Sequence, residues 1–244
     1  MRSEIAFHHS TFVALCLKID TMARLPFITF EGSEGCGKST QVKRLTARFE
    51  KLSIPFLVTR EPGGTPIGES IRELLQFAPQ SAVMTPETEL LLFEASRAQL
   101  VREVIKPALE SGKCVIADRF FDSTTVYQGI ARRLDNKLVQ QLNTLAVGNC
   151  IPDITFFLDV DLQTSHDRMK GPRRPDRMEQ QPDKFYEDVI AAYQDLAKRE
   201  PNRVVLIDGS GSADAIETEV WKILSGRFPM LATTSNVEHR TSNI

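Results

Sequence analysis

A glycine-rich segment near the start of the chain has residue types and a spacing suited to phosphate binding. Residues 32–39 read GSEGCGKS, which fits the pattern G-x-x-x-x-G-K-[ST]. Glycines allow backbone N–H groups to turn toward an anion, and a following helix adds the positive end of its dipole. Lys38 is then expected to reach the outer phosphates of a nucleoside triphosphate, and Ser39 to hold Mg²⁺ through its hydroxyl. The residues predicted to bind this nucleoside triphosphate are Gly32, Ser33, Glu34, Gly35, Cys36, Gly37, Lys38, Ser39 and Thr40.

A second pair of polar residues ends a later apolar run. The segment CVIADRF places Asp118 and Arg119 directly after residues 114–117. A carboxylate beside a triphosphate suits the positioning of Mg²⁺ or water, and an adjacent guanidinium suits a second phosphate group. The simpler alternative is a surface ion pair at a strand end. We predict that Ser39 and Asp118 form the metal site.

These side chains need a parallel sheet to bring them together. Continuous apolar runs, typical of strands buried on both faces, occupy residues 27–30, 55–59, 114–117, 154–158 and 203–207. Helical patterns occupy residues 38–52, 67–77, 86–111, 135–147 and 182–198. Strands separated by crossover helices predict an α/β fold, with helices on both faces of a parallel sheet. The order of strand, loop and helix around residues 32–39 favours a true phosphate loop over an incidental glycine-rich turn.

Composition limits the class of protein. The chain has 244 residues, 41% of them hydrophobic and 25% charged, which fits one soluble globular domain. A net charge of −2 argues against sequence-independent binding of nucleic acid or of a membrane surface. The four cysteines are too widely spaced for a metal site, so free thiols in a reducing compartment, the cytoplasm, are expected. No apolar run has the length of a membrane span.

The two ends of the chain are expected to lie outside the domain. Residues 1–24 carry only a short apolar patch, which lacks the features of a secretory signal, and we interpret them as a disordered or over-annotated extension. Residues 232–244 are polar and are expected to form a flexible tail. The predicted domain therefore spans residues 25–231.

Five segments, in their order along the chain, resemble the bacterial thymidylate kinase family. They are FEGSEGCGKST, TREPGGTPIGE, LLLFEASRAQ, DRFFDSTTVYQG and PRRPDRMEQ. The similarity runs from about Phe27 to Asp208. It implies the three-layer P-loop kinase fold, with a five-stranded parallel sheet, helices on both faces and a mobile lid at about residues 169–182. It also implies a homodimer that transfers the γ-phosphoryl group of ATP to dTMP with Mg²⁺, giving dTDP and ADP.

The resemblance assigns residues to the acceptor nucleotide. Phe93 is similar to the aromatic residue that stacks on thymine, although an ordinary core phenylalanine is the alternative. Arg97 lies four residues later on the same helix face and is expected to reach the edge of the base. Arg119 and Arg60 are expected to grip the monophosphate, with a solvated surface arginine as the alternative for Arg60. Glu34 resembles the acidic residue that meets the 3′-hydroxyl of the sugar.

The segment DRFFDSTTVYQG provides further contacts to the base and sugar. Thr124 and Gln128 are four residues apart, so they share a helix face and offer a hydroxyl and an amide to the pyrimidine edge. Tyr127 resembles the ring that crowds the 2′ side of the sugar, and a half-buried structural tyrosine is the alternative. We interpret Ser123 only as a helix cap. Phe120 departs from the tyrosine that is common in the family.

A basic segment is expected to supply the remaining positive charge. The phosphate loop has no arginine between Glu34 and Lys38, so stabilisation of the transferring group must come partly from elsewhere. The segment PRRPDRMEQ resembles a lid of the type that carries basic residues, although a basic loop is ordinarily just solvated. The residues predicted to be catalytic are Lys38, Arg119, Arg173, Arg174 and Arg177. Glu179 is expected to help hold the acceptor or the metal.

Other functions of a phosphate loop remain to be weighed. A GTPase carries the guanine reader N-K-x-D, but here Asn136 and Lys137 are followed by Leu138 and Val139. An ATPase motor would not place an arginine directly after its second-strand carboxylate. Two alternatives stay open: a P-loop kinase acting on another nucleotide or nucleoside, and a nucleotide-binding regulator without catalysis.

Overall fold

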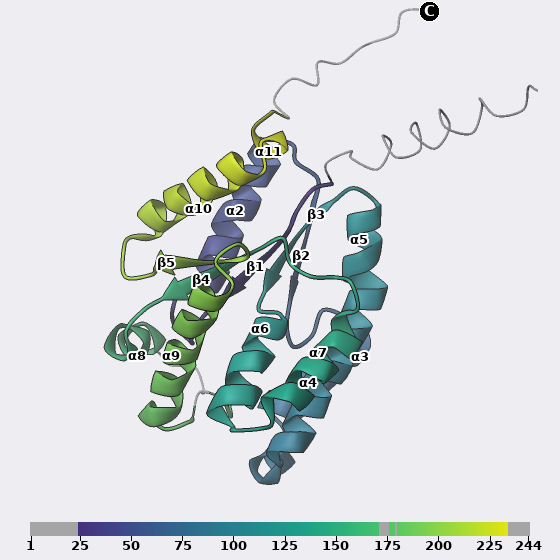
Figure 1. The fold of residues 1–244 in the computed structure, drawn as a ribbon, viewed down its shortest axis with the longest axis vertical. Coiled ribbons are helices and arrows are strands. Elements are labelled where there is room, and N and C mark those ends of the chain that lie inside the picture. Colours follow the sequence, from purple (N-terminus) through teal and green to yellow (C-terminus); the bar gives the residue numbers. More distant parts are fainter. Residues whose placement is uncertain (1–23, 171–175, 179, 234–244) are drawn as a thin grey trace, which may run out of the picture.

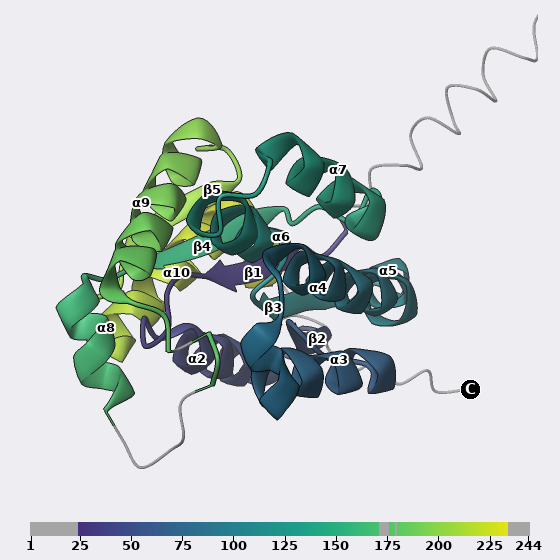
Figure 2. The ribbon, with the colours of Figure 1, turned by 90° about the horizontal axis from the view of Figure 1, so that it is seen from below.

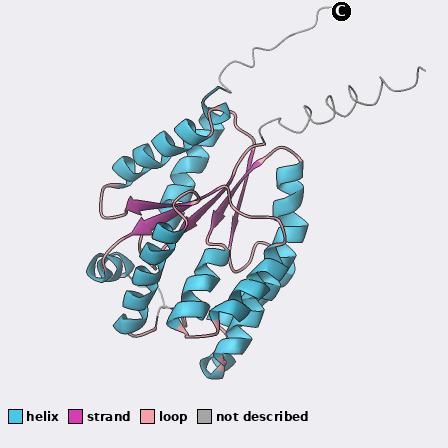
Figure 3. Cartoon of the chain, viewed as in Figure 1, coloured by secondary structure: helices cyan, strands magenta, loops and turns pink. Residues whose placement is uncertain are grey.

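Five parallel strands form one sheet in the computed structural model, which describes residues 24–170, 176–178 and 180–233 (Figure 1). Their spatial order is β2-β3-β1-β4-β5, so β1 lies at the centre and every neighbouring pair is parallel. The strands are β1 (Phe27–Glu31), β2 (Phe56–Arg60), β3 (Cys114–Asp118), β4 (Ile154–Asp159) and β5 (Val204–Asp208). The predicted five-stranded parallel sheet is confirmed, as Figure 3 shows with the strands between helices.

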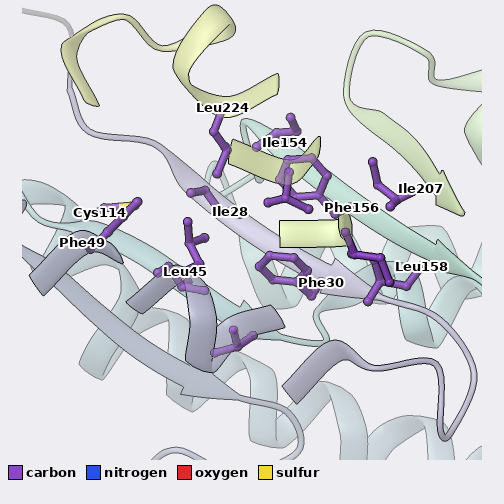
Figure 4. Packing of buried hydrophobic residues seen from close by; sticks show 14 of the residues in the cluster. Ile28, Phe30, Leu45, Phe49, Cys114, Ile154, Phe156, Leu158, Ile207 and Leu224 are labelled. Atoms are coloured by element: carbon purple, nitrogen blue, oxygen red, sulfur yellow. The ribbon is translucent and has the colours of Figure 1, made fainter. Parts of the chain in front are cut away.

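One face of the sheet is covered by α2 (Lys38–Lys51) and α10 (Ala213–Arg227). Successive strand residues point to opposite faces, so alternate residues of the three central strands contribute to this side. Ile28 of β1 belongs to the same buried cluster as Leu45 of α2 and Leu224 of α10 (Figure 4). This cluster fixes α2, and with it the loop between β1 and α2, against the centre of the sheet.

The opposite face is covered by α4 (Pro86–Leu100), α7 (Asn136–Val147) and α9 (Asp183–Arg199). Phe27 of β1 packs in a cluster with residues of α4 and α7, while Phe157 of β4 packs with residues of α9. Figure 2 shows α2 and α4 on opposite sides of the sheet. The predicted three-layer arrangement is therefore confirmed.

The predicted helical pattern 86–111 is one continuous helical segment with a changed register in its middle. It consists of α4, η2 (Val101–Ile105), which is π-helical, and α5 (Lys106–Glu110). Pro107 has no N–H to donate back along the helix, and the wider π-helical turn precedes it. The start at Pro86 and the end before Gly112 agree with the sequence signals, since Thr85 caps the helix and Gly112 has a φ of 76°.

The pattern at residues 67–77 matches α3 (Pro66–Gln76). Five short elements and one long helix, α10, were not predicted. The short ones are η1 (Pro79–Val83), α6 (Phe121–Thr124), η3 (Thr125–Ala131), α8 (Leu162–Met169) and α11 (Met230–Thr233). The signal for α10 was present in the sequence. Ser212 accepts a hydrogen bond from the N–H of Ala215 as an N-cap, and Ile216, Val220 and Leu224 recur every four residues on its buried face.

The prediction that all five strands are buried on both faces is wrong for the two outer strands. Val58 of β2 and Leu206 of β5 are each 45% exposed. Both strands lie at the edges of the sheet, and each has a neighbouring strand on one side only. An apolar run identifies a strand but not its place in the order.

The expectations for residues 1–23 and 234–244 fall outside the described residues. Within the described ranges, no helix is both long enough and apolar enough to cross a membrane.

The aromatic contacts of Phe49 in α2 predict how much a cavity in this core lowers the free energy of unfolding. Phe49 is fully buried and packs edge-to-face against Phe56 and Trp221. We expect Phe49→Ala to lower the free energy of unfolding by about 3–5 kcal/mol, because it removes the ring and leaves a cavity. Phe77→Ala is the matched control, since Phe77 is 50% exposed, and a change within about 0.5 kcal/mol is expected. Urea unfolding followed by the fluorescence of the single tryptophan measures both, and equal losses would contradict the assignment of this core.

Candidate active site

The loops that follow β1, β2 and β3 meet at the carboxyl ends of these neighbouring strands. In a parallel α/β sheet this edge is where ligands bind. Here it encloses a cavity of about 380 Å³. Among the residues that line it are Glu34, Lys38, Ser39, Arg60, Phe93, Asp118, Arg119, Thr124, Tyr127 and Gln128. The structure thus brings most of the predicted acceptor and metal residues together.

The loop between β1 and α2 has the backbone that a phosphate loop needs. Gly35 has a φ of 71°, and a Cβ there would lie 2.6 Å from the carbonyl oxygen of Ser165, so only glycine fits. Helix α2 starts directly after Gly37 without a side-chain cap, which leaves its first N–H groups open to a ligand. Residues 35–41 line a second cavity, of about 520 Å³, that extends to Arg168 and Gly211.

Lys38 lies where the two cavities meet. Its ammonium group donates to the carbonyl oxygens of Gly32 at 3.1 Å and Ser33 at 2.6 Å. The side chain lines both cavities, although Lys38 is only 7% exposed. A lysine in this place can contact an anion that spans the two cavities.

Ser39 and Asp118, the predicted metal residues, are in direct contact. The hydroxyl of Ser39 donates to Oδ2 of Asp118 at 2.6 Å. A hydroxyl and a carboxylate are oxygen donors of the kind that Mg²⁺ prefers, with phosphate oxygens and waters completing its octahedron. Among the described residues there is no cluster of three or more His, Cys, Asp or Glu side chains that could hold a metal without such help. These residues therefore fit a Mg²⁺ that arrives with a triphosphate.

Arg119 is the centre of a polar cluster on the wall of the first cavity. Its guanidinium donates to Glu34 at 2.7 Å, to the hydroxyl of Tyr127 at 3.3 Å and to the hydroxyl of Ser123 at 3.1 Å. The hydroxyl of Tyr127 in turn donates to Glu34 at 2.9 Å. Burial raises the pKa of Tyr127, so it stays a neutral hydrogen-bond donor. The residues predicted to contact the monophosphate, the 2′ side of the sugar and its 3′-hydroxyl are therefore hydrogen-bonded to one another.

Glu31 supports this cluster from beneath and was missed by the sequence analysis. Its buried carboxylate accepts from the backbone N–H of Phe120 at 2.7 Å, from the hydroxyl of Ser123 at 2.6 Å and from that of Tyr193 at 2.7 Å. Burial, and secondarily the charge of Asp122, raise the pKa of Glu31. The interpretation of Ser123 as a helix cap is wrong, because its hydroxyl links Glu31 to Arg119. A charged residue ending the apolar run FITFE was the available signal.

Arg97 lies beneath the cavity instead of lining it. It is 1% exposed and donates to the carboxylates of Glu61 and Glu94, to Asn143 and to the carbonyl oxygen of Phe120. These bonds engage every N–H group of the guanidinium. In this arrangement Arg97 has no free donor for a base edge, in contrast to the expectation drawn from its helix face.

Glu61, the partner of Arg97, is a second residue that sequence reasoning missed. It follows β2 and begins the turn that contains Gly63 and Gly64. Burial raises its pKa to about 7, although Arg97 partly offsets the effect. Arg60, directly before it, lines the cavity and donates to the carbonyl oxygen of Pro62 and to Glu69.

The first cavity is lined by three residues predicted to contact the base. Phe93, Thr124 and Gln128 all line it. The hydroxyl oxygen of Thr124 is buried and has no hydrogen-bond partner in the described part of the chain. Gln128 donates its amide N–H to the buried carboxylate of Glu89 at 2.7 Å.

The predicted lid is only partly covered by the structure. Arg173, Arg174 and Glu179 lie outside the described residues. Arg177 is described: it donates to the carbonyl oxygen of Leu75 in α3 at 3.0 Å and lies 2.6 Å from a carboxylate oxygen of Glu89 in α4. Asp176 and Met178, but not Arg177, line the cavity. The catalytic role expected for Arg177 stays a prediction.

A phosphate loop on a parallel sheet, with Arg119 beside it on the wall of one cavity, is typical of the class of P-loop kinases that act on small phosphorylated acceptors. A sequence model of the family "Thymidylate kinase" matches residues 30–220. The chain belongs to the thymidylate kinase family.

Individual relatives support this assignment. The chain is 47% identical over 209 residues to a thymidylate kinase of Geobacter sulfurreducens, covering 83% of this chain and 98% of that protein. It is 45% identical over 206 residues to one of Syntrophotalea carbinolica, covering 80% and 93%. A crystal structure of thymidylate kinase from Ehrlichia chaffeensis superimposes with a TM-score of 0.67 at 36% identity, covering 83% of this chain and 99% of that one.

The raised pKa of Glu61 predicts a pH dependence of stability. The folded protein binds this proton more tightly than the unfolded chain does, so the stabilisation is complete below the ordinary pKa of 4.5 and is lost as the pH rises through about 7. Relative to Glu61→Gln, we expect the wild-type free energy of unfolding to fall by on the order of 1–3 kcal/mol between about pH 5 and about pH 8. Urea unfolding across this range measures the difference.

Glu69 is the control for this pH dependence. The N–H of Gly64 lowers the pKa of Glu69, so its contribution is lost as the pH falls and not as it rises. Relative to Glu69→Gln, the free energy of unfolding of the wild type should therefore not fall as the pH rises from about 5 to about 8. Parallel pH profiles for wild type and Glu61→Gln would show that Glu61 is not held as described.

Proposed function

We propose that this protein transfers the γ-phosphoryl group of ATP to dTMP, giving dTDP and ADP. The observation that carries the proposal is the cluster of Arg119, Glu34 and Tyr127, which joins the phosphate loop to the wall of the acceptor cavity. Membership of the thymidylate kinase family supports the same reaction.

ATP is assigned to the phosphate loop and the second cavity. The N–H groups at the start of α2 and the ammonium of Lys38 would bind the phosphates, and the space toward Arg168 and Gly211 would take the nucleoside. Ser39 and Asp118 would hold Mg²⁺. When bound, the metal would neutralise phosphate charge and orient the triphosphate. The backbone and side chains of the loop would make the remaining contacts with the triphosphate.

dTMP is assigned to the first cavity. Phe93 offers a flat surface for the base, while Thr124 and Gln128 offer polar groups to its edge. Tyr127 would crowd the 2′ side of the sugar and Glu34 would accept from the 3′-hydroxyl. Arg119, with Arg60 at the mouth, would pair with the monophosphate, because a guanidinium fork matches a phosphate well.

The proposed mechanism needs no strong general base. The second pKa of a phosphate monoester is about 6, so the acceptor oxygen is already largely ionised at neutral pH. The difficulty is to bring two anions together in line. Lys38 lines both cavities and Arg119 lines the acceptor cavity, so both can contact the phosphates, and Arg173 and Arg174 of the lid segment are proposed to complete the charge stabilisation.

We propose that two copies of the chain form a homodimer through α4 and α7. These helices pack against each other and present large apolar side chains outward, among them Leu91, 55% exposed, and Leu145, 70% exposed. Light scattering tests this directly, and a monomer at micromolar concentration would refute it. We also propose a cytoplasmic location, which the free thiols of Cys36, Cys114 and Cys150 favour.

ADP release from ATP and Mg²⁺, measured with and without dTMP, tests the reaction itself. We expect ADP to form only when dTMP is present, and dUMP, dCMP and thymidine to be poorer acceptors. Faster turnover with one of these would assign a different acceptor, and ATP binding without any turnover would indicate a regulator. Lys38→Ala is expected to lower the rate by roughly 10³-fold or more, because it removes the charge on the transferring phosphates. Lys51→Ala, at the exposed far end of α2, should leave the rate unchanged.

Arg119→Ala separates the two nucleotide sites. We expect kcat/KM for dTMP to fall by roughly 10²-fold or more, with the KM for ATP within about threefold of wild type, since Arg119 faces only the first cavity. Arg44→Ala, which removes a surface ion pair with Asp214, is the control and should change neither value. Equal losses toward both nucleotides would contradict the assignment of Arg119 to the acceptor.

A further inference from the structure

Glu89 is a buried carboxylate with no place in the mechanism described so far. It lies near the start of α4, is 1% exposed and does not line the acceptor cavity. One of its oxygens accepts the amide N–H of Gln128, which does line the cavity, at 2.7 Å. Glu89 thus stands directly behind a side chain that faces the acceptor.

Two arginines occupy the rest of this carboxylate. Arg132 donates to both oxygens at 3.3 Å, and Arg177 lies 2.6 Å from the second oxygen. The arginines come from the end of η3 and from the segment after residue 175, so Glu89 is held from two directions. An ionised carboxylate only accepts hydrogen bonds, and here each oxygen faces a donor.

We propose that Glu89 is a positioning residue that fixes the orientation of the Gln128 amide and thereby the choice of base. The amide has one donor end and one acceptor end, and a carboxylate neighbour admits only the donor end. The carbonyl oxygen of Gln128 is therefore the end presented to the cavity. The inference rests on the proposed assignment of Gln128 to the base.

A fixed carbonyl oxygen selects between pyrimidines. Thymine and uracil carry an N–H donor at N3, whereas cytosine carries a lone pair there. Reversing the amide to suit cytosine would turn its carbonyl oxygen against the carboxylate of Glu89, which leaves two acceptors facing each other. A site built to hydrogen-bond one partner rejects an analogue that leaves its polar groups unpaired. The hydroxyl of Thr124 has no partner among the described residues, so it can donate to a neighbouring carbonyl of the same base.

The test compares selectivity, taken as the inhibition constant of dCMP divided by the KM for dTMP. In Glu89→Gln the new amide can donate as well as accept, so Gln128 is no longer held in one orientation. We expect selectivity to fall roughly tenfold, with the KM for ATP unchanged within about twofold. Glu87→Gln removes the same charge from an exposed position of the same helix and should retain wild-type selectivity.

A double-mutant cycle with Gln128→Ala separates this role from a purely structural one. If Glu89 acts through Gln128, Glu89→Gln should cause no further loss of selectivity in the Gln128→Ala background. An undiminished loss in that background, or wild-type selectivity in Glu89→Gln, would overturn the inference. If Gln128→Ala alone left the KM for dTMP unchanged, the assignment of Gln128 to the base would fall, and the inference with it.

Glu89→Asp guards against a variant that does not fold. It keeps a negative charge near both arginines. Its side chain is one methylene group shorter, which draws the carboxylate back from the amide of Gln128. Its selectivity is expected to fall in the same direction while its melting temperature stays closer to that of wild type. Unchanged selectivity in a folded Glu89→Asp would also count against the proposal.

Discussion

The geometry of the acceptor site depends on one hydrogen-bonded carboxylate at the end of the central strand. Glu31 closes β1 and accepts from the backbone of Phe120 and the hydroxyl of Ser123, both of which follow β3. These hydrogen bonds fix the position of the loop after β1 relative to the loop after β3. Arg119 has a φ of 71°, a left-handed conformation that a residue with a side chain keeps only when its surroundings hold it. Glu31 is a main part of those surroundings.

The same arrangement recurs around the cavity. Glu61 holds Arg97 beside the turn after β2, and Glu89 accepts a hydrogen bond from Gln128, which lines the cavity. Burying a charge is costly, and a buried ion pair is often no more stabilising than apolar residues of the same size. These carboxylates are therefore better explained by the positions that they impose than by stability. The apolar clusters on both faces of the sheet offset the cost.

Positioning matters here because the proposed reaction joins two anions. Positive groups must surround the two phosphates before the phosphates approach each other. The side chains that carry these charges must also keep their positions when no substrate is bound. Within the protein, Arg119 is paired with the carboxylate of Glu34, and Lys38 donates to backbone carbonyl oxygens of the loop. Such a site is already ordered before the substrates arrive, so little reorganisation is needed during the reaction.

What the sequence determined by itself was the sheet with its helices, the phosphate loop and the residues around the cavity. The sheet and the phosphate loop follow from spacing along the chain: an apolar run predicts a strand, and a glycine pattern before a helix predicts an anion site. The acceptor residues around the cavity were expected from the resemblance to the thymidylate kinase family. The strand order, the buried side of Arg97, the position of Arg177 and the roles of Glu31, Glu61 and Glu89 were decided only by the tertiary structure. The physical reason is that a buried charge takes whichever partner folding brings to it. Those partners lie 89 residues away for Glu31 and Phe120, 36 for Glu61 and Arg97, and 39 for Glu89 and Gln128, and no local pattern connects them.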